Sequence, residues 1–348
     1  MLTAAIIGCG RVVQVGHLLG LKEVADQVRV VAVADPVAEN REKVGEALAV
    51  PPQARFAEYR ELLAAVPCDF VDLALPHFLH EEVIIACAQA ARHILTEKPL
   101  TTSMASATRI ATAVRQAGVV FGVQHNYRYF PHFAAMRRAI AEGHIGRPFF
   151  VRNEGIGGGG HWPGSEGYDP DWRIRAARGG GGALLDNGYH SIYTCEFFMG
   201  APVAQVLARV GTFQPQREVD DLAALLLTHE DGGISSAQVS WAIQAGGRTV
   251  LEVHGTEGSL QIADDQSVRL YRNRTGEWET IFTPTGSLSF RFTFGHVFRD
   301  FASALDAGSQ PAAGLQDALH NLAIIMAGYE SERLGKAVPV LDLERQTT

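Results

Sequence analysis

The stretch TAAIIGCGRVV, residues 3–13, contains an apolar segment that runs directly into a glycine-rich turn. The consecutive apolar residues from Ala4 to Ile7 are typical of a strand that is buried on both faces. Gly8 and Gly10 then form a G-x-G pair, at which a backbone turns tightly or closely approaches a ligand. A strand, such a turn and a following helix predict a parallel α/β sheet at the start of the chain.

The alternation of apolar strands with helices continues to about residue 123. Further strands are expected at VRVVAVAD (28–35), FVDLALP (70–76), HILTEK (93–98) and VVFGVQ (119–124), and helices at NREKVGEALA (40–49) and HEEVIIACAQAA (80–91). Continuous apolar strands separated by helices indicate a parallel sheet that is covered on both faces. We therefore expect a doubly wound Rossmann domain over residues 1–123.

The first turn and the end of the second strand together predict a dinucleotide site. The backbone at Gly8 and Gly10 can approach a pyrophosphate, whose charge the N-terminus of the next helix stabilises. Asp35 follows Gly10 by 25 residues, and a carboxylate there accepts hydrogen bonds from the adenosine ribose and repels a 2′-phosphate. The pattern favours NAD over NADP. Because Val13 occupies the third position of the glycine motif, a glycine turn in another α/β fold is the alternative.

The composition of the chain excludes several classes of partner. Its 348 residues are more than most single cores hold, so two domains are expected. Thirty basic and 38 acidic residues give a net charge of −8, which argues against a nucleic-acid partner and against an anionic membrane. The N-terminus does not resemble a signal peptide, and no apolar run approaches the roughly 18 residues of a membrane span.

Four scattered cysteines, Cys9, Cys68, Cys87 and Cys195, lie inside apolar segments and lack metal-type spacing. Buried free thiols in a reducing compartment are the expected state. The sequence therefore predicts a cytoplasmic protein.

The segment HILTEKPL, residues 93–100, places Glu97, Lys98 and Pro99 at the carboxyl end of a predicted strand. Ligands of open α/β sheets bind outside these strand ends. A lysine at such a position can reach a substrate hydroxyl. Lys98 is therefore a candidate catalytic residue, and a solvated turn lysine is the alternative.

The segment GGGGALLDNGYH, residues 179–190, predicts a helix that begins near Ala183 and ends near Gly200. Asp186 and His190 are four residues apart and so share one face of that helix. The glycines before the helix indicate a tight turn or a close approach of the backbone. The helix alone favours a core histidine with satisfied hydrogen bonds, whereas together with the segment Glu97–Pro99 we interpret Asp186 and His190 as a catalytic pair.

In combination, the glycine turn, PHFLHEE (76–82), EKP (97–99) and GGGALLDNGYH (180–190) resemble the Gfo/Idh/MocA oxidoreductases, the family of glucose-fructose oxidoreductase and inositol dehydrogenase. The resemblance extends over essentially the whole chain. It implies an NAD- or NADP-dependent enzyme that transfers a hydride at a ring carbon of a sugar, cyclitol or related polyol. It also implies a second, α+β domain.

Carried over to this chain, the resemblance implies that Lys98 is the active-site lysine and that Asp186 and His190 are the catalytic pair. We expect His190 to act as the base, Asp186 to orient its ring, and Lys98 to stabilise negative charge on the reacting oxygen. The residues expected at the cofactor are Gly8, Gly10, Arg11, Val12, Asp35, Pro76, His77, Glu97 and Lys98. Tyr193 stands where many relatives carry an acidic residue, so altered substrate contacts are expected there.

Beyond about residue 124, strand patterns dominate the sequence. Strands are expected at 148–157, 201–213, 220–231, 233–243, 249–258 and 259–264, and helix from about 298 to 332. Such a run predicts a C-terminal α+β domain over residues 124–348 with a mostly antiparallel open sheet. A sheet with one broad apolar face often pairs with a second subunit, and the resemblance likewise implies a homodimer or homotetramer.

A glycine-rich and aromatic segment over residues 155–173 is expected near the substrate. Aromatic rings can stack on a sugar ring, and polar side chains can bond its hydroxyls; the alternative is that the aromatic residues anchor a mobile loop. The candidate substrate contacts are Tyr127, Arg128, His161, Trp162, Trp172, Arg173 and Tyr193. His77 is expected to approach the nicotinamide ribose, and His80 to have a structural role at a helix start.

Three alternatives to a dehydrogenase remain open. One is a lyase or glycosidase that reduces and reoxidises NAD within one turnover. Another is a binding or regulatory protein that keeps the fold, against which the intact Lys98, Asp186 and His190 argue. The third is a metal enzyme, but the candidate ligands have no recognised spacing, so no metal is expected. These ligands would be His161, Asp169, Asp171 and His190.

Overall fold

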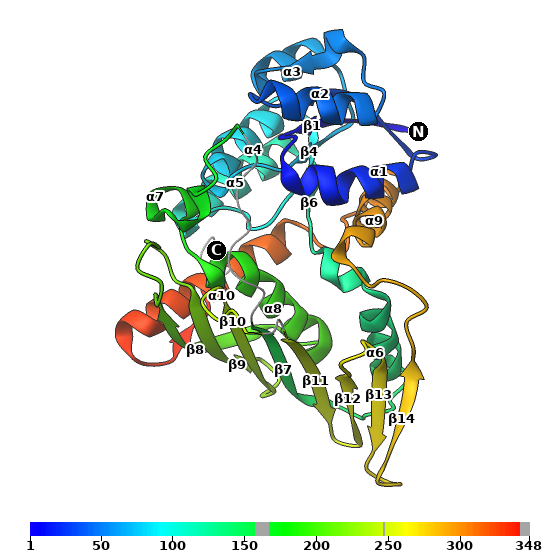
Figure 1. Cartoon of the computed structure of the whole chain (residues 1–348), viewed down its shortest axis with the longest axis vertical. Helices are drawn as coiled ribbons and strands as arrows, with labels where there is room; N and C mark the ends of the chain where they lie inside the picture. The colour runs from blue at the N-terminus through cyan, green and yellow to red at the C-terminus, as the bar shows by residue number, and fades with distance from the viewer. Residues whose placement is uncertain (157–166, 246–247, 342–348) are drawn as a thin grey trace. The chain divides into compact units, whose positions relative to one another are not determined.

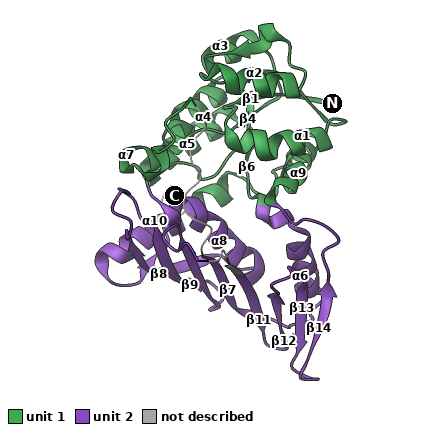
Figure 2. Ribbon diagram, viewed as in Figure 1, with its two compact units in different colours: residues 1–126, 162–180, 290–319 green, residues 127–161, 181–289, 320–348 purple. Residues whose placement is uncertain are grey.

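The structure is a computed structural model that describes residues 1–156, 167–245 and 248–341 (Figure 1). Its described residues form two compact units, which Figure 2 distinguishes by colour. The first unit is made up of described residues within 1–126, 162–180 and 290–319, and the second of those within 127–161, 181–289 and 320–348. Each unit therefore combines segments that are far apart in the sequence.

The first unit contains a parallel sheet whose described strands have the order β3-β2-β1-β4-β5-β6. The strands are β1 (Leu2–Ile7), β2 (Val28–Ala34), β3 (Arg55–Phe56), β4 (Phe70–Leu73), β5 (His93–Thr96) and β6 (Phe121–Val123). The helices of the strand connections are α1 (Leu18–Glu23), α2 (Ala38–Ala47), α3 (Tyr59–Ala65), α4 (His80–Gln89) and α5 (Met104–Ala117). This is the doubly wound order of dinucleotide-binding folds, which reverses between β1 and β4. The Rossmann prediction is confirmed; the two-residue edge strand β3 was missed.

The glycine turn after β1 is required by the fold itself. Gly8 has a φ of +93°, and a Cβ atom there would lie 2.2 Å from the carbonyl oxygen of Ala74. Helical backbone then runs from Arg11 to Glu23, with a π-helical stretch, η1, over Val13–His17. The wider π-helical turn begins at Val13, where the motif normally has a small residue.

A distant segment completes the first unit. Helix α9 (Phe294–Ala307) contacts α1, and its Phe301 ring packs edge-on against Phe70 of β4 at a centroid distance of 5.3 Å. A Cβ atom at Gly122 of β6 would lie 2.7 Å from the same ring. The periodicity of strands does not indicate that a C-terminal helix packs on an N-terminal sheet. The sequence analysis therefore did not predict this contact.

The second unit contains an open sheet with the described order β14-β13-β12-β11-β7-β10-β9-β8-β15. Its strands are β7 (Pro148–Ile156), β8 (Val203–Gly211), β9 (Leu222–His229), β10 (Ile234–Ser240), β11 (Arg248–Gly255), β12 (Gly258–Ile262), β13 (Val268–Arg272), β14 (Glu277–Phe282) and β15 (Val338–Pro339). Strands β7 and β10 pair in parallel, and the other neighbouring described strands are antiparallel. The mostly antiparallel open sheet is confirmed; β13, β14 and β15 were not predicted.

Helices cover one face of this sheet. Helix α8 (Ala183–Met199) contacts β7, β9 and β10 (Figure 1). It ends at Gly200, whose φ is +77°, so both predicted ends of this helix are confirmed. The remaining described helices are α6 (Pro131–Ala141), α7 (Ala176–Gly179) and α10 (Leu315–Leu334).

Two properties of the whole chain can be checked in its described part. The four cysteines are buried free thiols, as predicted. Among the described residues, no helix combines the length and the apolar character needed to cross a membrane.

A buried histidine of the first unit, His17, lies between two carboxylates. Its Nδ1 is 2.7 Å from Oδ2 of Asp72 on β4, and its Nε2 is 3.0 Å from Oε1 of Glu97. The other carboxylate oxygen of Glu97 accepts a hydrogen bond from the backbone N–H of Lys98 at 3.1 Å. The imidazole also packs against Phe294, with ring centroids 4.7 Å apart. His17 therefore links the helix after the glycine turn to the EKP segment.

The charge of His17 is set by these neighbours. Burial alone would lower its pKa, but the Asp72 and Glu97 carboxylates outweigh burial and raise the pKa to about 10. The imidazole is fully buried. Removing the cation would leave Asp72 and Glu97 with an uncompensated buried charge, which is strongly destabilising.

We predict that His17→Leu lowers the free energy of unfolding by about 3–5 kcal/mol near neutral pH. The pKa of His17 rises from 6.5 to about 10 on folding. The stabilisation is therefore fully present below pH 6.5 and is lost as the pH rises through about 10. Urea unfolding at these two ends of the pH range measures the free energy of unfolding of both proteins. The difference between wild type and variant should be smaller at the high-pH end.

His80→Leu is the matched control for this prediction, because burial lowers the pKa of His80. Its effect on unfolding should not shrink over the same range. If His17→Leu lowered the free energy of unfolding equally at both ends of the pH range, the result would contradict a charged His17.

Candidate active site

Helix α8, which carries the predicted catalytic pair, is anchored at its N-terminus by Asp220. The two carboxylate oxygens of Asp220 accept hydrogen bonds from the backbone N–H groups of Gly182 at 2.7 Å and Leu184 at 2.8 Å. Its carbonyl oxygen accepts from the N–H of Ala183 at 2.9 Å. Tyr329 of α10 donates its hydroxyl to the same carboxylate at 2.8 Å. The carboxylate satisfies N–H groups that an α-helix leaves unpaired and lies at the positive end of its dipole.

The glycines before α8 allow this contact. A Cβ atom at Gly182 would lie 1.8 Å from the carbonyl oxygen of Asp220, which confirms the predicted close approach of the backbone. Burial raises the pKa of Asp220, although the hydrogen bonds from Leu184, Tyr329 and Gly182 oppose the increase. The sequence analysis missed Asp220; the Asp-Asp pair at the start of the strand predicted over 220–231 was the available signal.

The ring of His190 has a defined orientation on α8. It stacks on Tyr127 with a centroid distance of 4.0 Å and an interplanar angle of 8°, and its Nδ1 is 2.8 Å from the hydroxyl of Tyr193. The Tyr193 oxygen also accepts the backbone N–H of Tyr127 at 3.2 Å. Because a hydroxyl oxygen can accept two hydrogen bonds, Nδ1–H can donate to Tyr193. In that tautomer the lone pair of Nε2 can act as a base.

The structure describes a partner of His190 in addition to the one that the sequence suggested. We expected Asp186 to orient the ring, whereas the contact that the structure describes is with Tyr193. Asp186 is buried one turn earlier on α8, and its orienting role stays a prediction. Tyr193 is itself buried, so it contributes to the site through His190; a direct contact with substrate also stays a prediction.

In the first unit, the predicted cofactor residues lie at the carboxyl ends of the parallel strands. Asp35 directly follows β2 and is buried. Its Oδ2 accepts the backbone N–H of Cys9 in the glycine turn at 2.7 Å, and its Oδ1 accepts that of Val37 at 2.8 Å. Burial raises the pKa of Asp35, although these two N–H groups oppose the increase. The carboxylate is thus held against the turn.

These residues fit a dinucleotide. A carboxylate offers about four lone-pair sites, so Asp35 can accept ribose hydroxyls in addition to its two backbone partners. The glycine turn, with Gly10 and the start of the helix at Arg11 and Val12, lies at the switch point of the sheet. Glu97 and Lys98 follow β5 at the same edge of the sheet.

Pro76 and His77 follow β4 along the chain, and His77 contacts the segment predicted to bind substrate. Its Nδ1 is 3.2 Å from the carbonyl oxygen of Gly179, and its ring packs edge-on against Trp172 at a centroid distance of 4.7 Å. Trp172 is buried, and the Arg173 guanidinium lies 4.2 Å from the centroid of its ring. This arrangement favours the anchoring role that was the alternative for these residues. Contact of Trp172 and Arg173 with substrate stays a prediction.

The other candidate residues have different outcomes. Both ring nitrogens of His80 face backbone carbonyls, those of Leu100 and Leu75 at 3.2 and 3.0 Å, which agrees with a structural role at the start of α4. The guanidinium of Arg128 lies 5.8 Å from the ring centroid of Tyr193, so it borders the His190 partner. His161 and Trp162 lie outside the described residues.

The described residues give no support to a metal centre. Among them, no group of three or more His, Cys, Asp or Glu side chains could hold a metal ion. Asp169, one of the candidate ligands, instead pairs with Arg178 at 2.8 Å and Arg175 at 3.7 Å.

Comparisons of the sequence with known proteins identify relatives of this chain. A 1,5-anhydro-D-fructose reductase from Ensifer adhaerens is 30% identical over 286 residues, which cover 80% of this chain and 82% of the relative. A D-apiose dehydrogenase from Paraburkholderia graminis is 27% identical over 98% of this chain and 90% of its own. The scyllo-inositol 2-dehydrogenase (NAD(+)) of Bacillus subtilis is 26% identical over 99% of this chain and 97% of its own. These names give no support to the lyase or glycosidase alternative.

Solved structures and family models agree with the fold. A levoglucosan dehydrogenase in complex with NADH superposes with a TM-score of 0.87 at 22% identity, covering 98% of this chain and all of the other. Residues 2–125 match the model of the oxidoreductase family with an NAD-binding Rossmann fold, and residues 133–261 match the GFO/IDH/MocA C-terminal domain. The chain is therefore an NAD-dependent oxidoreductase of the Gfo/Idh/MocA family.

Proposed function

We propose that this oxidoreductase acts on a CH–OH group at a ring carbon of a carbohydrate or cyclitol. The observation that carries the proposal is the His190 ring, which is stacked on Tyr127 and bonded through Nδ1 to Tyr193. In the tautomer that donates Nδ1–H to Tyr193, Nε2 carries the lone pair of a base. The names of the relatives, which include an apiose, an anhydrofructose and an inositol enzyme, support the substrate class.

The chain's own residues supply proton transfer and charge. His190 takes the proton from the reacting hydroxyl, because the pKa range of histidine suits a base near neutral pH. Asp186, one turn earlier on α8, stabilises the imidazolium that forms. Lys98 stabilises the negative charge that develops on the same oxygen. NAD, when bound, accepts the hydride.

The cofactor is held by residues of the first unit. Asp35, fixed by the N–H groups of Cys9 and Val37, accepts the adenosine ribose hydroxyls and disfavours the 2′-phosphate of NADP. The turn residues Gly8, Gly10, Arg11 and Val12 border the pyrophosphate, and Pro76, His77, Glu97 and Lys98 border the nicotinamide side. Tyr127, Arg128, Trp172 and Arg173 are the described candidates for further substrate contacts.

We predict NADH formation when the wild type is supplied with NAD and a panel of scyllo-inositol, D-apiose and levoglucosan. NADP should support a much lower rate. His190→Ala and Lys98→Ala should each lower kcat by about 10²- to 10⁴-fold, the usual contribution of a positioned proton-transfer group. The measurement is the increase in NADH absorbance.

His144→Ala is the matched control, because His144 is partly exposed and pairs with Glu142 on the surface; its rate should equal that of the wild type. Undiminished NADH formation by His190→Ala would contradict the role of His190. Consumption of a polyol without NADH formation would contradict the dehydrogenase reaction itself.

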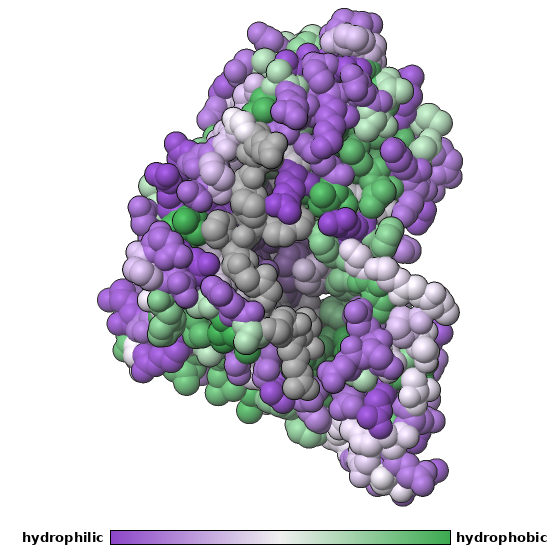
Figure 3. Space-filling model, in the orientation of Figure 1, coloured by the Kyte–Doolittle hydropathy of each residue, from purple (hydrophilic) through white to green (hydrophobic). Residues whose placement is uncertain are grey.

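We also propose that the chain is a homodimer or homotetramer that pairs through the open sheet. Residues on β8, β9 and β10 largely alternate between buried side chains on one face and exposed or half-buried side chains on the other. Leu207, Leu226 and Ile234 on the exposed face are 41% to 44% exposed, and Leu207 is directly opposite Leu226. Green side chains appear in Figure 3 along the margin where Figure 1 has β8 and β9. Such a patch is typical of a subunit interface.

We predict that Leu226→Arg dissociates this oligomer, because a charge would be buried at the centre of an apolar interface. Light scattering should give the wild type a multiple of 37.6 kDa and the variant 37.6 kDa. Leu334→Arg, at an exposed leucine on the last turn of α10, should leave the mass unchanged. A wild type of 37.6 kDa would contradict the proposal.

The cytoplasm is the compartment that we propose for the protein. All four cysteines are free and buried, which suits a reducing environment.

A further inference from the structure

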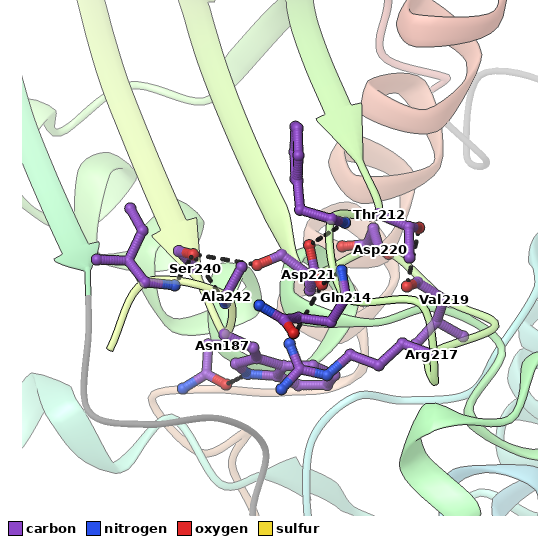
Figure 4. Close-up of polar contacts among 12 residues, drawn as sticks. Asn187, Thr212, Gln214, Arg217, Val219, Asp220, Asp221, Ser240 and Ala242 are labelled. Atoms are coloured by element: carbon purple, nitrogen blue, oxygen red, sulfur yellow. Dashed lines mark hydrogen bonds and ion pairs between the residues drawn. The ribbon is translucent and has the colours of Figure 1, made fainter. Parts of the chain in front are cut away.

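Asn187 of α8 forms a cluster with side chains from two other segments of the second unit, those of Trp241 and Arg217. Trp241, directly after β10, is buried, and its indole N–H donates a hydrogen bond to Oδ1 of Asn187 at 2.6 Å. The guanidinium of Arg217, from the loop between β8 and β9, lies 5.9 Å from the centroid of the Trp241 ring. Figure 4 shows the labelled Asn187 and Arg217 side chains in this one region.

The backbone around this cluster is fixed by Asp221, the residue after the Asp220 anchor of α8. Its carboxylate accepts the N–H groups of Phe213 and Gln214, each at 2.9 Å, and pairs with Nη1 of Arg217 at 3.3 Å. Its carbonyl oxygen accepts the backbone N–H of Trp241 at 2.7 Å. One residue therefore holds both the loop that carries Arg217 and the strand end that carries Trp241.

Trp241 sets the orientation of the Asn187 amide. An indole N–H is a donor only, so the side-chain atom that faces it must be the amide oxygen. The NH₂ group of Asn187 then points away from Trp241. Asn187 is exposed although Asp186 and Gly188 beside it are buried, so a ligand can reach this residue.

Asn187 is a neighbour of His190, the proposed base, on the surface of α8. It precedes His190 by three residues, and side chains at this spacing are neighbours about 5–6 Å apart on a helix. The amide donor of Asn187 is therefore a neighbour of the proposed base on the helix surface.

The exposed amide of Asn187 favours an oxygen ligand. Asn187 presents N–H donors, and Arg217 can only donate. The side chain of Arg217 is 9% exposed, and its Nε is buried without a hydrogen-bond partner in the described part of the chain. The N–H donors of Asn187 recognise acceptors, such as the hydroxyl oxygens of a polyol.

We propose that Asn187 is a substrate-binding residue, which donates a hydrogen bond to a second hydroxyl oxygen of the polyol whose reacting hydroxyl faces His190. Trp241 acts as a positioning residue, because its N–H fixes the amide in the donating orientation. The inference rests on the proposed function and adds to it a requirement for a second hydroxyl on the substrate.

Steady-state kinetics with NAD and the best substrate among scyllo-inositol, D-apiose and levoglucosan test this inference. Loss of one hydrogen bond to a ligand corresponds to about a 3- to 10-fold change in affinity. Asn187→Ala should therefore raise KM by about this factor, with kcat much less affected because the bond exists in ground and transition states alike. The pH profile of kcat should stay that of the wild type, unlike that of a variant at the base.

A double-mutant cycle separates binding from positioning. Trp241→Phe keeps an aromatic ring but removes the N–H, so it should raise KM by less than Asn187→Ala. In the double variant Asn187→Ala/Trp241→Phe, KM should be no higher than in Asn187→Ala alone, because Trp241 acts through the amide. Additive increases would overturn the positioning role.

Asn273→Ala is the control, since Asn273 is an exposed asparagine of the same unit that donates to the carbonyl oxygen of Thr256; its KM should be unchanged. If Asn187 served only to pair with Trp241, Asn187→Ala would lower the unfolding temperature and leave KM unchanged, and this result would overturn the proposal.

A wild type that forms no NADH with these three polyols would refute the proposed function but not yet the role of Asn187. Calorimetric binding of the same polyols to the NAD-saturated chain would then decide it. Weaker binding by Asn187→Ala supports the inference; equal binding by both proteins, or no binding by the wild type, overturns it.

Discussion

The carboxylate of Asp220 at the start of α8 is the contact on which the geometry of the second unit depends. Three successive backbone N–H groups, those of Gly182, Ala183 and Leu184, donate to this one residue. Because the contact is buried and includes both carboxylate oxygens, it fixes the position of the helix along its axis as well as its start. Asp186, Asn187 and His190 lie within the first two turns after the anchor, so their positions follow from it.

The first unit fixes its own functional segment in a related way. There a buried imidazolium, His17, bridges Asp72 and Glu97, and Glu97 in turn accepts the N–H of Lys98. In both units a buried charged group is satisfied by several hydrogen bonds and sits directly beside the residues proposed to act on substrate. Groups held in this way require little reorganisation during a reaction. Such preorganisation allows them to stabilise the charge that develops in a transition state. The cost is that removal of either anchor leaves buried polar groups unpaired.

The sequence predicted those features that depend on local patterns. The parallel strands of the first unit, the glycine turn, the ends of α8 and the close backbone approach at Gly182 each follow from periodicity or from glycine chemistry over a few residues. The contacts of Asp220, His17 and Trp241 do not follow from local patterns, because their hydrogen-bond partners include residues 36 to 109 positions distant in the sequence. The contacts of these residues depend on which strand ends are adjacent in space. A sequence pattern predicts where strands occur but not which strands are neighbours.

The same distinction explains why the reaction type is easier to predict than the substrate. The candidate base lies within a short motif on a single helix, and this motif is part of the family resemblance that predicted the reaction. The proposed recognition cluster draws Asn187 from α8, Arg217 from the β8–β9 loop and Trp241 from the end of β10. These three meet only because β9 and β10 pair in the register that sets Leu222 opposite Ser240, which brings Asp221 to Trp241. A change in that loop can therefore alter which hydroxyl pattern is bound while Asp186 and His190, one helix away, keep their positions.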